Sequence, residues 1–324
     1  MNSKVMWCGL IILAGVSGLW GAFAPAGGYS ATKLYSTEGM SEVINGLDLE
    51  GQKLYFGQDT KINALDLDNS NQVQTVGTLP ANLGIALVKQ QAGTTYTAFG
   101  TSYSPPYPYK MGYIDGGGNY VNQLDEDGIY DCAVNSSGDC YIAANPGALG
   151  SKIFRYDWST GNTVEIADIG GYAGGLAFDS ADNLFYADQG DGGTRQASIL
   201  MYTASQVEAG GLTAVDGLSV LSVTAGSIDF DNNDFLYATT GWGATLAKYD
   251  LGTGNKLTDI AYGGIGKFVL ADEKIYCVDT DWGTNSSTIQ VIVPEPGTLV
   301  LLGLGGLGMF RRKRRRHPQK NTND

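Results

Sequence analysis

The chain has 324 residues, of which 47 are glycine and 19 are tyrosine, and only 16% of its residues are charged. Outside Lys4 and the tail at residues 311–324, it carries 12 Lys and Arg against 32 Asp and Glu, a net charge near −20. A surface of this charge repels phosphate backbones, which excludes nucleic acid as a partner, and the glycine and tyrosine content favours tight turns and aromatic-rich strands.

The first 26 residues have the pattern of an export signal. Lys4 supplies the positive start, residues 5–19 form an apolar run, and Ala22-Phe23-Ala24 or Ala24-Pro25-Ala26 offers small residues for cleavage. We therefore expect the Sec machinery to export the chain with removal of residues 1–26, which leaves a body of residues 27–293.

The body is a repeat with copies that start near residues 46, 84, 131, 175, 227 and 267. Each copy has a short apolar strand, a tight polar turn, a strand with a central Tyr or Phe, a variable loop and a third strand. A looser fourth strand follows most copies. Four short strands at this period are typical of a β-propeller blade, so we predict an all-β, six-bladed β-propeller, with five or seven blades as alternatives. A pair of β-sandwiches would not explain six copies.

The two ends of the repeat region complement each other. The last copy runs into the C-terminal tail after three strands, whereas residues 33–45, before the first copy, contain a spare strand. A propeller commonly closes its ring by placing an N-terminal strand in the last blade. We expect that arrangement here.

Three cysteines remain after removal of the signal. Cys132 and Cys140 flank a predicted hairpin turn at residues 135–138, and facing residues of a hairpin lie within the distance that a disulfide can bridge. We therefore predict a Cys132–Cys140 disulfide, and a buried thiol at Cys277.

Aspartate-rich turns raise the alternative of bound calcium. A calcium-binding EF-hand loop that began at Asp229 would need glycine and an acidic residue where the chain has Asp234 and Thr240. Asx turns between strands explain the same residues. We therefore expect no metal and no cofactor, with Ca²⁺ at such turns as the alternative; the turn residues concerned are Asp229, Asp231, Asn233, Asp234, Asp66, Asp68 and Ser70.

The variable loops between second and third strands would gather on one face of a propeller, around the mouth of its channel. Aromatic rings beside carboxylates suit a sugar, which stacks on a ring and donates hydroxyl hydrogen bonds. The alternative is that these loops are solvated and their aromatic side chains pack on neighbouring blades. The candidate ligand-binding residues are Tyr103, Tyr107, Trp242, Trp282, Asp188, Asp191, Arg195 and Asp281.

The chain offers little for catalysis by histidine. Its only histidine, His317, lies in the C-terminal tail, which excludes a Ser-His-Asp triad and a His-ligated metal in the body. We therefore expect a protein that is not an enzyme and has no catalytic residues. The alternative is a carboxylate- or metal-dependent propeller enzyme that acts on lactones or glycans, since paired carboxylates hydrolyse glycosides and some six-bladed propellers of similar layout are lactonases.

The tail at residues 294–324 has three parts in order. Pro294-Glu295-Pro296 is followed by an apolar run at residues 298–310, which is short for a membrane-spanning helix, and then by six basic residues that begin with Arg311, Arg312 and Lys313. An ordinary C-terminal anchor is the alternative. The three parts together resemble the PEP-CTERM sorting signal of Gram-negative bacteria.

The resemblance covers about the last 30 residues and carries several implications. In that family an inner-membrane protease, the exosortase, recognises the signal and cuts near Pro-Glu-Pro, after transient anchoring of the substrate by a short transmembrane helix. Carriers of the signal are associated with exopolysaccharide and biofilms. The resemblance therefore implies a protein of the cell surface or extracellular matrix that serves as a binding or structural module, with extracellular polysaccharide or a matrix protein as its partner.

Overall fold

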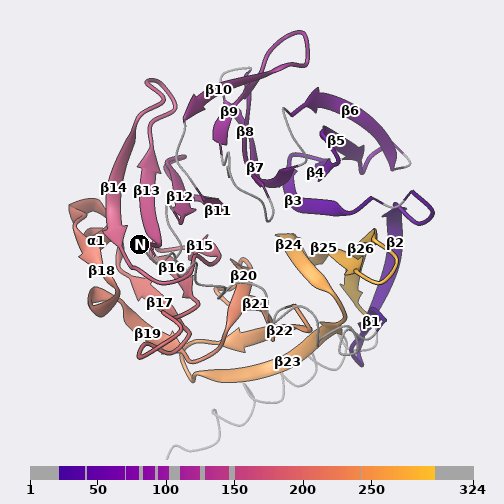
Figure 1. Ribbon diagram of the computed structural model, residues 1–324. Coiled ribbons are helices and arrows are strands. Elements are labelled where there is room, and N and C mark those ends of the chain that lie inside the picture. Colours follow the sequence, from indigo (N-terminus) through magenta and orange to yellow (C-terminus); the bar gives the residue numbers. More distant parts are fainter. Residues whose placement is uncertain are drawn as a thin grey trace, which may run out of the picture.

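In the computed structural model the protein is a ring of six blades, each of four antiparallel strands (Figure 1). Blades 1 and 2 are joined in one eight-stranded sheet by the parallel pairing of Gly46 with Ile85. The structure describes residues 22–40, 42–69, 71–79, 83–91, 94–101, 110–124, 128–145, 150–241 and 243–295. The prediction of a six-bladed β-propeller is confirmed, and the alternatives of five or seven blades are wrong.

Each blade is an antiparallel sheet whose first strand lies nearest the centre of the ring. Blades 1 and 2 comprise β3 (Ile44–Glu50), β4 (Lys53–Gln58), β5 (Lys61–Asp66) and β6 (Gln72–Thr78), then β7 (Leu83–Gln91), β8 (Thr94–Thr101), β9 (Lys110–Ile114) and β10 (Tyr120–Leu124). Blades 3 and 4 comprise β11 (Ile129–Val134), β12 (Cys140–Ala144), β13 (Lys152–Tyr156) and β14 (Thr163–Asp168), then β15 (Leu176–Phe178), β16 (Leu184–Asp188), β17 (Ser198–Tyr202) and β19 (Leu218–Leu221). Blade 5 comprises β20 (Ala225–Phe230), β21 (Leu236–Thr240), β22 (Thr245–Asp250) and β23 (Asn255–Tyr262).

Blade 6 contains the expected ring closure. Its strands are β24 (Ile265–Ala271), β25 (Lys274–Asp281), β26 (Ser286–Pro294) and, on the outside, the N-terminal β2 (Tyr29–Ser36). β2 begins at Tyr29, four residues before the segment at 33–45 that was predicted to hold the closing strand. Its antiparallel register with β26 runs from Tyr29 opposite Pro294 to Ser36 opposite Thr288. The chain is held in a ring by strands from its two ends.

Two short additions extend the blades at their outer edges. β1 (Ala24–Pro25) pairs with β23, so the folded body includes residues that the sequence assigned to the export signal. Between β17 and β19, the chain forms α1 (Ala204–Ala209), β18 (Leu212–Thr213) and the 3₁₀ turn η1 (Ala214–Asp216), and β18 pairs in parallel with β14. The side chain of Thr203 accepts a hydrogen bond from the Gln206 N–H and caps α1.

The hydrophobic core lies between neighbouring blades. Leu184 and Tyr202 of blade 4 are buried against Tyr141 and Ile153 of blade 3, and similar clusters lie between blades 1 and 2, 4 and 5, 5 and 6, and 6 and 1. Because each blade packs its two faces on its neighbours, the inner strands are held rigidly around the axis. Their inner edges have no further strand to pair with, so their polar groups need other partners.

The described residues contain no helix that is long and apolar enough to cross a membrane. The predicted anchor run at residues 298–310, Arg311, Arg312 and Lys313 lie outside the described residues, as does Pro296.

Candidate functional site

A cavity of about 220 Å³ lies in the central channel. Every inner strand contributes to its wall, and the lining includes the last residues of β3, β11 and β15, which precede the short turns. The cavity is therefore at the short-turn end of the channel, opposite the variable loops. One lining residue from each blade in order is Asp48, Val88, Cys132, Leu176, Asp229 and Lys267.

Three aspartates of the inner strands each bridge to the following blade. Asp48 accepts hydrogen bonds from the N–H groups of Leu49 in its own strand and Val88 in blade 2. Asp229 in blade 5 does the same with Phe230, at 2.9 Å, and with Leu270 in blade 6, at 3.2 Å. Each carboxylate thus satisfies a backbone donor on the open inner edge of the next blade.

Asp131 repeats this arrangement between blades 3 and 4. Its carboxylate accepts hydrogen bonds from the N–H groups of Cys132, at 2.9 Å, and Leu176, at 3.1 Å. The bridges occur in blades 1, 3 and 5, so that they join the blades in three pairs around the channel.

Lys267 places a positive charge among these carboxylates. Its ammonium group forms an ion pair with Asp131, whose side chain is only 3% exposed. Burial alone would lower the pKa of Lys267, but the charge and hydrogen bond of Asp131, together with the charges of Asp48 and Asp229, outweigh burial and raise it. The lysine is therefore a fixed cation in the wall of the cavity.

Asp48 and Asp229 differ from Asp131 in having no ion pair with Lys267, and burial raises the pKa of both carboxyl groups. Burial raises the pKa of Asp48 to about 7, against the opposing effects of the Val88 and Leu49 N–H groups and of Lys267. Burial likewise raises the pKa of Asp229 to about 6. A carboxyl group with a pKa near neutrality is suited to general acid–base catalysis, because both of its protonation states are populated at working pH.

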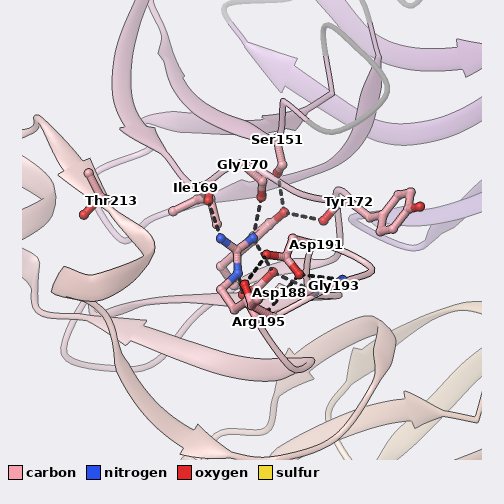
Figure 2. Close-up of polar contacts among 12 residues, drawn as sticks. Ser151, Ile169, Gly170, Tyr172, Asp188, Asp191, Gly193, Arg195 and Thr213 are labelled. Atoms are coloured by element: carbon pink, nitrogen blue, oxygen red, sulfur yellow. Dashed lines mark hydrogen bonds and ion pairs between the residues drawn. The ribbon is translucent and has the colours of Figure 1, made fainter.

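The predicted ligand-binding residues Asp188 and Arg195 lie side by side and form an ion pair with each other (Figure 2). Nε of Arg195 lies 2.7 Å from Oδ2 of Asp188, whose side chain is fully buried. The guanidinium also donates to the backbone carbonyls of Ile169, at 2.8 Å, and Gly170, at 2.6 Å, in the connection between blades 3 and 4. Both charges are thus committed to holding that connection on blade 4.

Of the other predicted loop residues, Asp191 lies beside this pair (Figure 2), and its carboxylate accepts a hydrogen bond from the Arg195 N–H at 2.9 Å. Asp191 and Asp281 each accept a hydrogen bond from the N–H group two residues ahead, at 2.8 Å, which shapes their own loops. Trp282 is 53% exposed beside Asp281. Tyr103, Tyr107 and Trp242 lie outside the described residues.

Of the aspartates predicted to lie in turns, Asp231 has the contacts of an Asx turn, whereas the prediction for Asp229 is wrong because Asp229 lies in β20 and bridges to blade 6. Asp231 accepts hydrogen bonds from the N–H groups of Asn233 and Phe235 and from the ammonium of Lys248, at 2.7 Å. Asp234 accepts from Ser180 of the preceding blade. In the ranges that the structure describes, no group of three His, Cys, Asp or Glu side chains is placed to hold a metal ion.

The predicted disulfide is not formed in the structure. Cys140 pairs with Val134 and Cys132 with Ile142, so the two cysteines lie diagonally across the hairpin and not directly opposite each other. Both are buried free thiols, as is Cys277.

Asp48 and Lys267 were not predicted as site residues, and Asp229 was assigned to a turn, although the sequence carries one signal of the channel site. Asp48 and Asp229 occupy the same position in two repeats, between two apolar residues of an inner strand, in Leu47-Asp48-Leu49 and Ile228-Asp229-Phe230. Aspartate is rarely buried in a strand of apolar residues unless its carboxylate has polar partners, and here these carboxylates border the channel cavity.

Comparisons with known proteins confirm the predicted sorting motif in the tail and the propeller fold of the body. The PEP-CTERM protein-sorting motif matches residues 293–316. No curated protein sequence matches the chain. The protein is thus a six-bladed β-propeller with a PEP-CTERM sorting motif, which indicates export and membrane-anchored sorting in a Gram-negative bacterium by an exosortase.

Solved structures with a similar fold include several enzymes. A gluconolactonase from Xanthomonas campestris is 15% identical with a TM-score of 0.61, over 83% of this chain and 91% of that one. A luciferin-regenerating enzyme is 11% identical with a TM-score of 0.61, over 83% and 96% of the two chains. A glucose dehydrogenase is 10% identical with a TM-score of 0.60, over 81% and 98%.

These neighbours correct our expectation that the protein is not an enzyme. That expectation relied on the absence of histidine from the body. In the neighbours the same fold carries enzymes. At this level of identity the likeness establishes the fold, and the chemistry must be argued from the channel itself.

Proposed function

We propose that the protein is an exported hydrolase that opens sugar-derived lactones in the extracellular polysaccharide matrix. The observation that carries this proposal is one cavity bordered by two carboxyl groups with pKa values of about 7 and about 6 and by a fixed ammonium group. The gluconolactonase among the structural neighbours supports the substrate class.

The three side chains suit the steps of lactone hydrolysis. The carboxylate of Asp48 removes a proton from a water molecule, whose oxygen adds to the lactone carbonyl carbon. The ammonium of Lys267 stabilises the negative charge that develops on the carbonyl oxygen. The bond between the carbonyl carbon and the ring oxygen then breaks, the ring oxygen takes the proton from Asp48, and a hydroxy acid leaves. Asp229 accepts hydrogen bonds from substrate hydroxyl groups.

Lys267 takes the place of a metal ion in this account. A metal-dependent lactonase needs a set of oxygen donors around the ion, and the described residues do not provide one. The positive charge in the wall comes from the lysine, which is fixed by Asp131.

The size of the cavity limits the substrate. A volume of about 220 Å³ is below the roughly 300–1,000 Å³ typical of pockets for drug-sized ligands. A single sugar-derived ring suits this volume better than an oligosaccharide, so the natural substrate is a monomeric lactone released in the matrix.

The sorting motif supports the location. The exosortase cuts the chain in the membrane and releases the propeller toward the cell surface, where extracellular polysaccharide is the expected partner and source of substrate.

The test is an assay of the purified, processed protein on a panel of sugar lactones, with acid release followed at pH 7.5 with and without a chelator. We expect hydrolysis well above the uncatalysed rate, unchanged by the chelator. Absence of activity on every lactone would rule out the proposed reaction, and loss of activity with the chelator would rule out the role of Lys267.

A further inference from the structure

The strand pair that closes the ring ends on the sorting motif itself. Pro294 is the last residue of β26 and lies opposite Tyr29 of β2. The N–H group of Glu295 donates a hydrogen bond to the Gly28 carbonyl at 2.9 Å. The first two residues of the motif are therefore part of the folded propeller.

This pairing competes with any enzyme that reads the motif as an extended peptide. A protease commonly binds a substrate segment by adding it as a strand, which uses the backbone N–H and carbonyl groups of the segment. Pro294 has no N–H group, so the N–H of Glu295 is the first backbone donor of the motif. In the folded protein the Gly28 carbonyl already holds that donor.

The core sets a limit to how far the strand can open. Ile292, two residues before Pro294, is fully buried in a cluster with Phe268 and Ile275. Glu295 is exposed, and Val293 and Pro294 are half-buried. Strand ends fray at low cost, whereas a buried apolar residue does not leave its cluster without loss of the fold.

We propose that the exosortase acts on this protein only after residues 293–295 peel away from residues 28–30, so that opening of this end of the β2–β26 strand pair sets the rate of processing. The strand pair from Ala31–Ile292 to Ser36–Thr288 stays intact during this opening and afterwards. The cut therefore releases a propeller whose ring is still closed.

Two disulfide locks test this proposal in the full chain. Ser30→Cys with Val293→Cys joins a directly opposed pair beside the motif, and Ser36→Cys with Thr288→Cys joins a pair at the far end of the same strands. Each variant is incubated, oxidised or reduced, with membranes that contain the exosortase, and loss of the C-terminal tail is followed by mass. Of the four native cysteines, Cys132, Cys140 and Cys277 are buried, and Cys8 is changed to serine in every variant.

We expect the oxidised lock beside the motif to slow processing at least about ten-fold relative to its reduced form, and the far lock to change it less than about two-fold. The reduced form of each variant controls for the substitutions, and the far lock controls for the effect of reductant on the exosortase. Equal rates for the oxidised and reduced near lock would overturn the proposal.

An insertion provides an independent test that needs no disulfide. A Gly-Ser-Gly-Ser insertion between Val293 and Pro294 separates the motif from β26 without changing any residue of the motif. We expect processing to become about five-fold faster, the equivalent of roughly 1 kcal/mol for one backbone hydrogen bond. The same insertion between Gly283 and Thr284, in the exposed turn before β26, is the control and should leave the rate unchanged. A rate that is unchanged or lower after the insertion at 293 would contradict the proposal.

Discussion

The two ends of the propeller channel use similar charged residues in opposite ways. At the loop end, Asp188 is fully buried but directly paired with Arg195, which also holds two backbone carbonyls. At the short-turn end, Asp48 and Asp229 are held by backbone N–H groups, and burial moves the pKa of each toward neutrality. A buried carboxylate with a full ionic partner is a structural clamp, whereas one held by amides beside a cavity can exchange a proton with a substrate.

Removal of the Asp48 carboxylate should have the largest effect on activity. We expect Asp48→Asn to lower kcat for lactone opening by about 10²-fold or more, the usual contribution of a general base. Asp191→Asn, at the loop end, is the matched control and should leave kcat unchanged, since Asp191 only shapes its own loop. Steady-state kinetics of the two variants shows which end of the channel holds the catalytic site. A larger loss of kcat in Asp191→Asn than in Asp48→Asn would place it at the loop end.

Removal of the Arg195 clamp should affect stability and not chemistry. Arg195→Ala leaves the fully buried carboxylate of Asp188 without its cation, which costs about 3 kcal/mol in the free energy of unfolding. Denaturant titration measures this loss, and kcat of the folded variant should match that of the wild type. A loss below about 1 kcal/mol would show that the clamp is not structural.

The raised pKa values at the short-turn end predict a dependence of stability on pH. Asp48 and Asp229 hold their protons up to about pH 7 and about pH 6 in the folded protein, and release them near pH 4 when unfolded. The folded state therefore binds more protons between these values, and the free energy of unfolding falls as pH rises from 4 to 7. Denaturation of the wild type and of the Asp48→Asn/Asp229→Asn variant across this range should show a shallower fall in the variant. Parallel curves would mean that the two carboxyls titrate normally.

The exposed aromatic at the loop end should matter least. Trp282 is 53% exposed, so Trp282→Ala should change the free energy of unfolding by less than about 0.5 kcal/mol and leave lactone opening unchanged. A marked increase in KM in this variant would show that the loop end takes part in substrate binding.

The architecture could be predicted from the sequence because the repeat is local. The inner strands begin at Ile44, Leu83, Ile129, Leu176, Ala225 and Ile265, within two residues of the predicted starts. Ring closure also followed, since a missing strand and a spare one were visible in the sequence.

The site could not be predicted in the same way, because its residues come from four blades. Asp48, Asp131, Asp229 and Lys267 are brought together only by the closure of the ring around the channel. Asp188 and Arg195 were predicted as ligand-binding residues for a related reason. Their separation in the sequence does not reveal that they neutralise each other. In the β11–β12 hairpin the residue opposite Cys140 is Val134, two residues from Cys132, and a turn sequence alone does not determine this register.

The most direct test of the channel as the working site is a crystal structure of the processed protein soaked with a sugar lactone or its hydroxy-acid product. We expect ligand density in the cavity at the short-turn end, with the carbonyl or carboxylate group at the ammonium of Lys267 and hydroxyl groups at Asp229. Density against Trp282 and the loops at the opposite end, with the cavity holding only water, would contradict it.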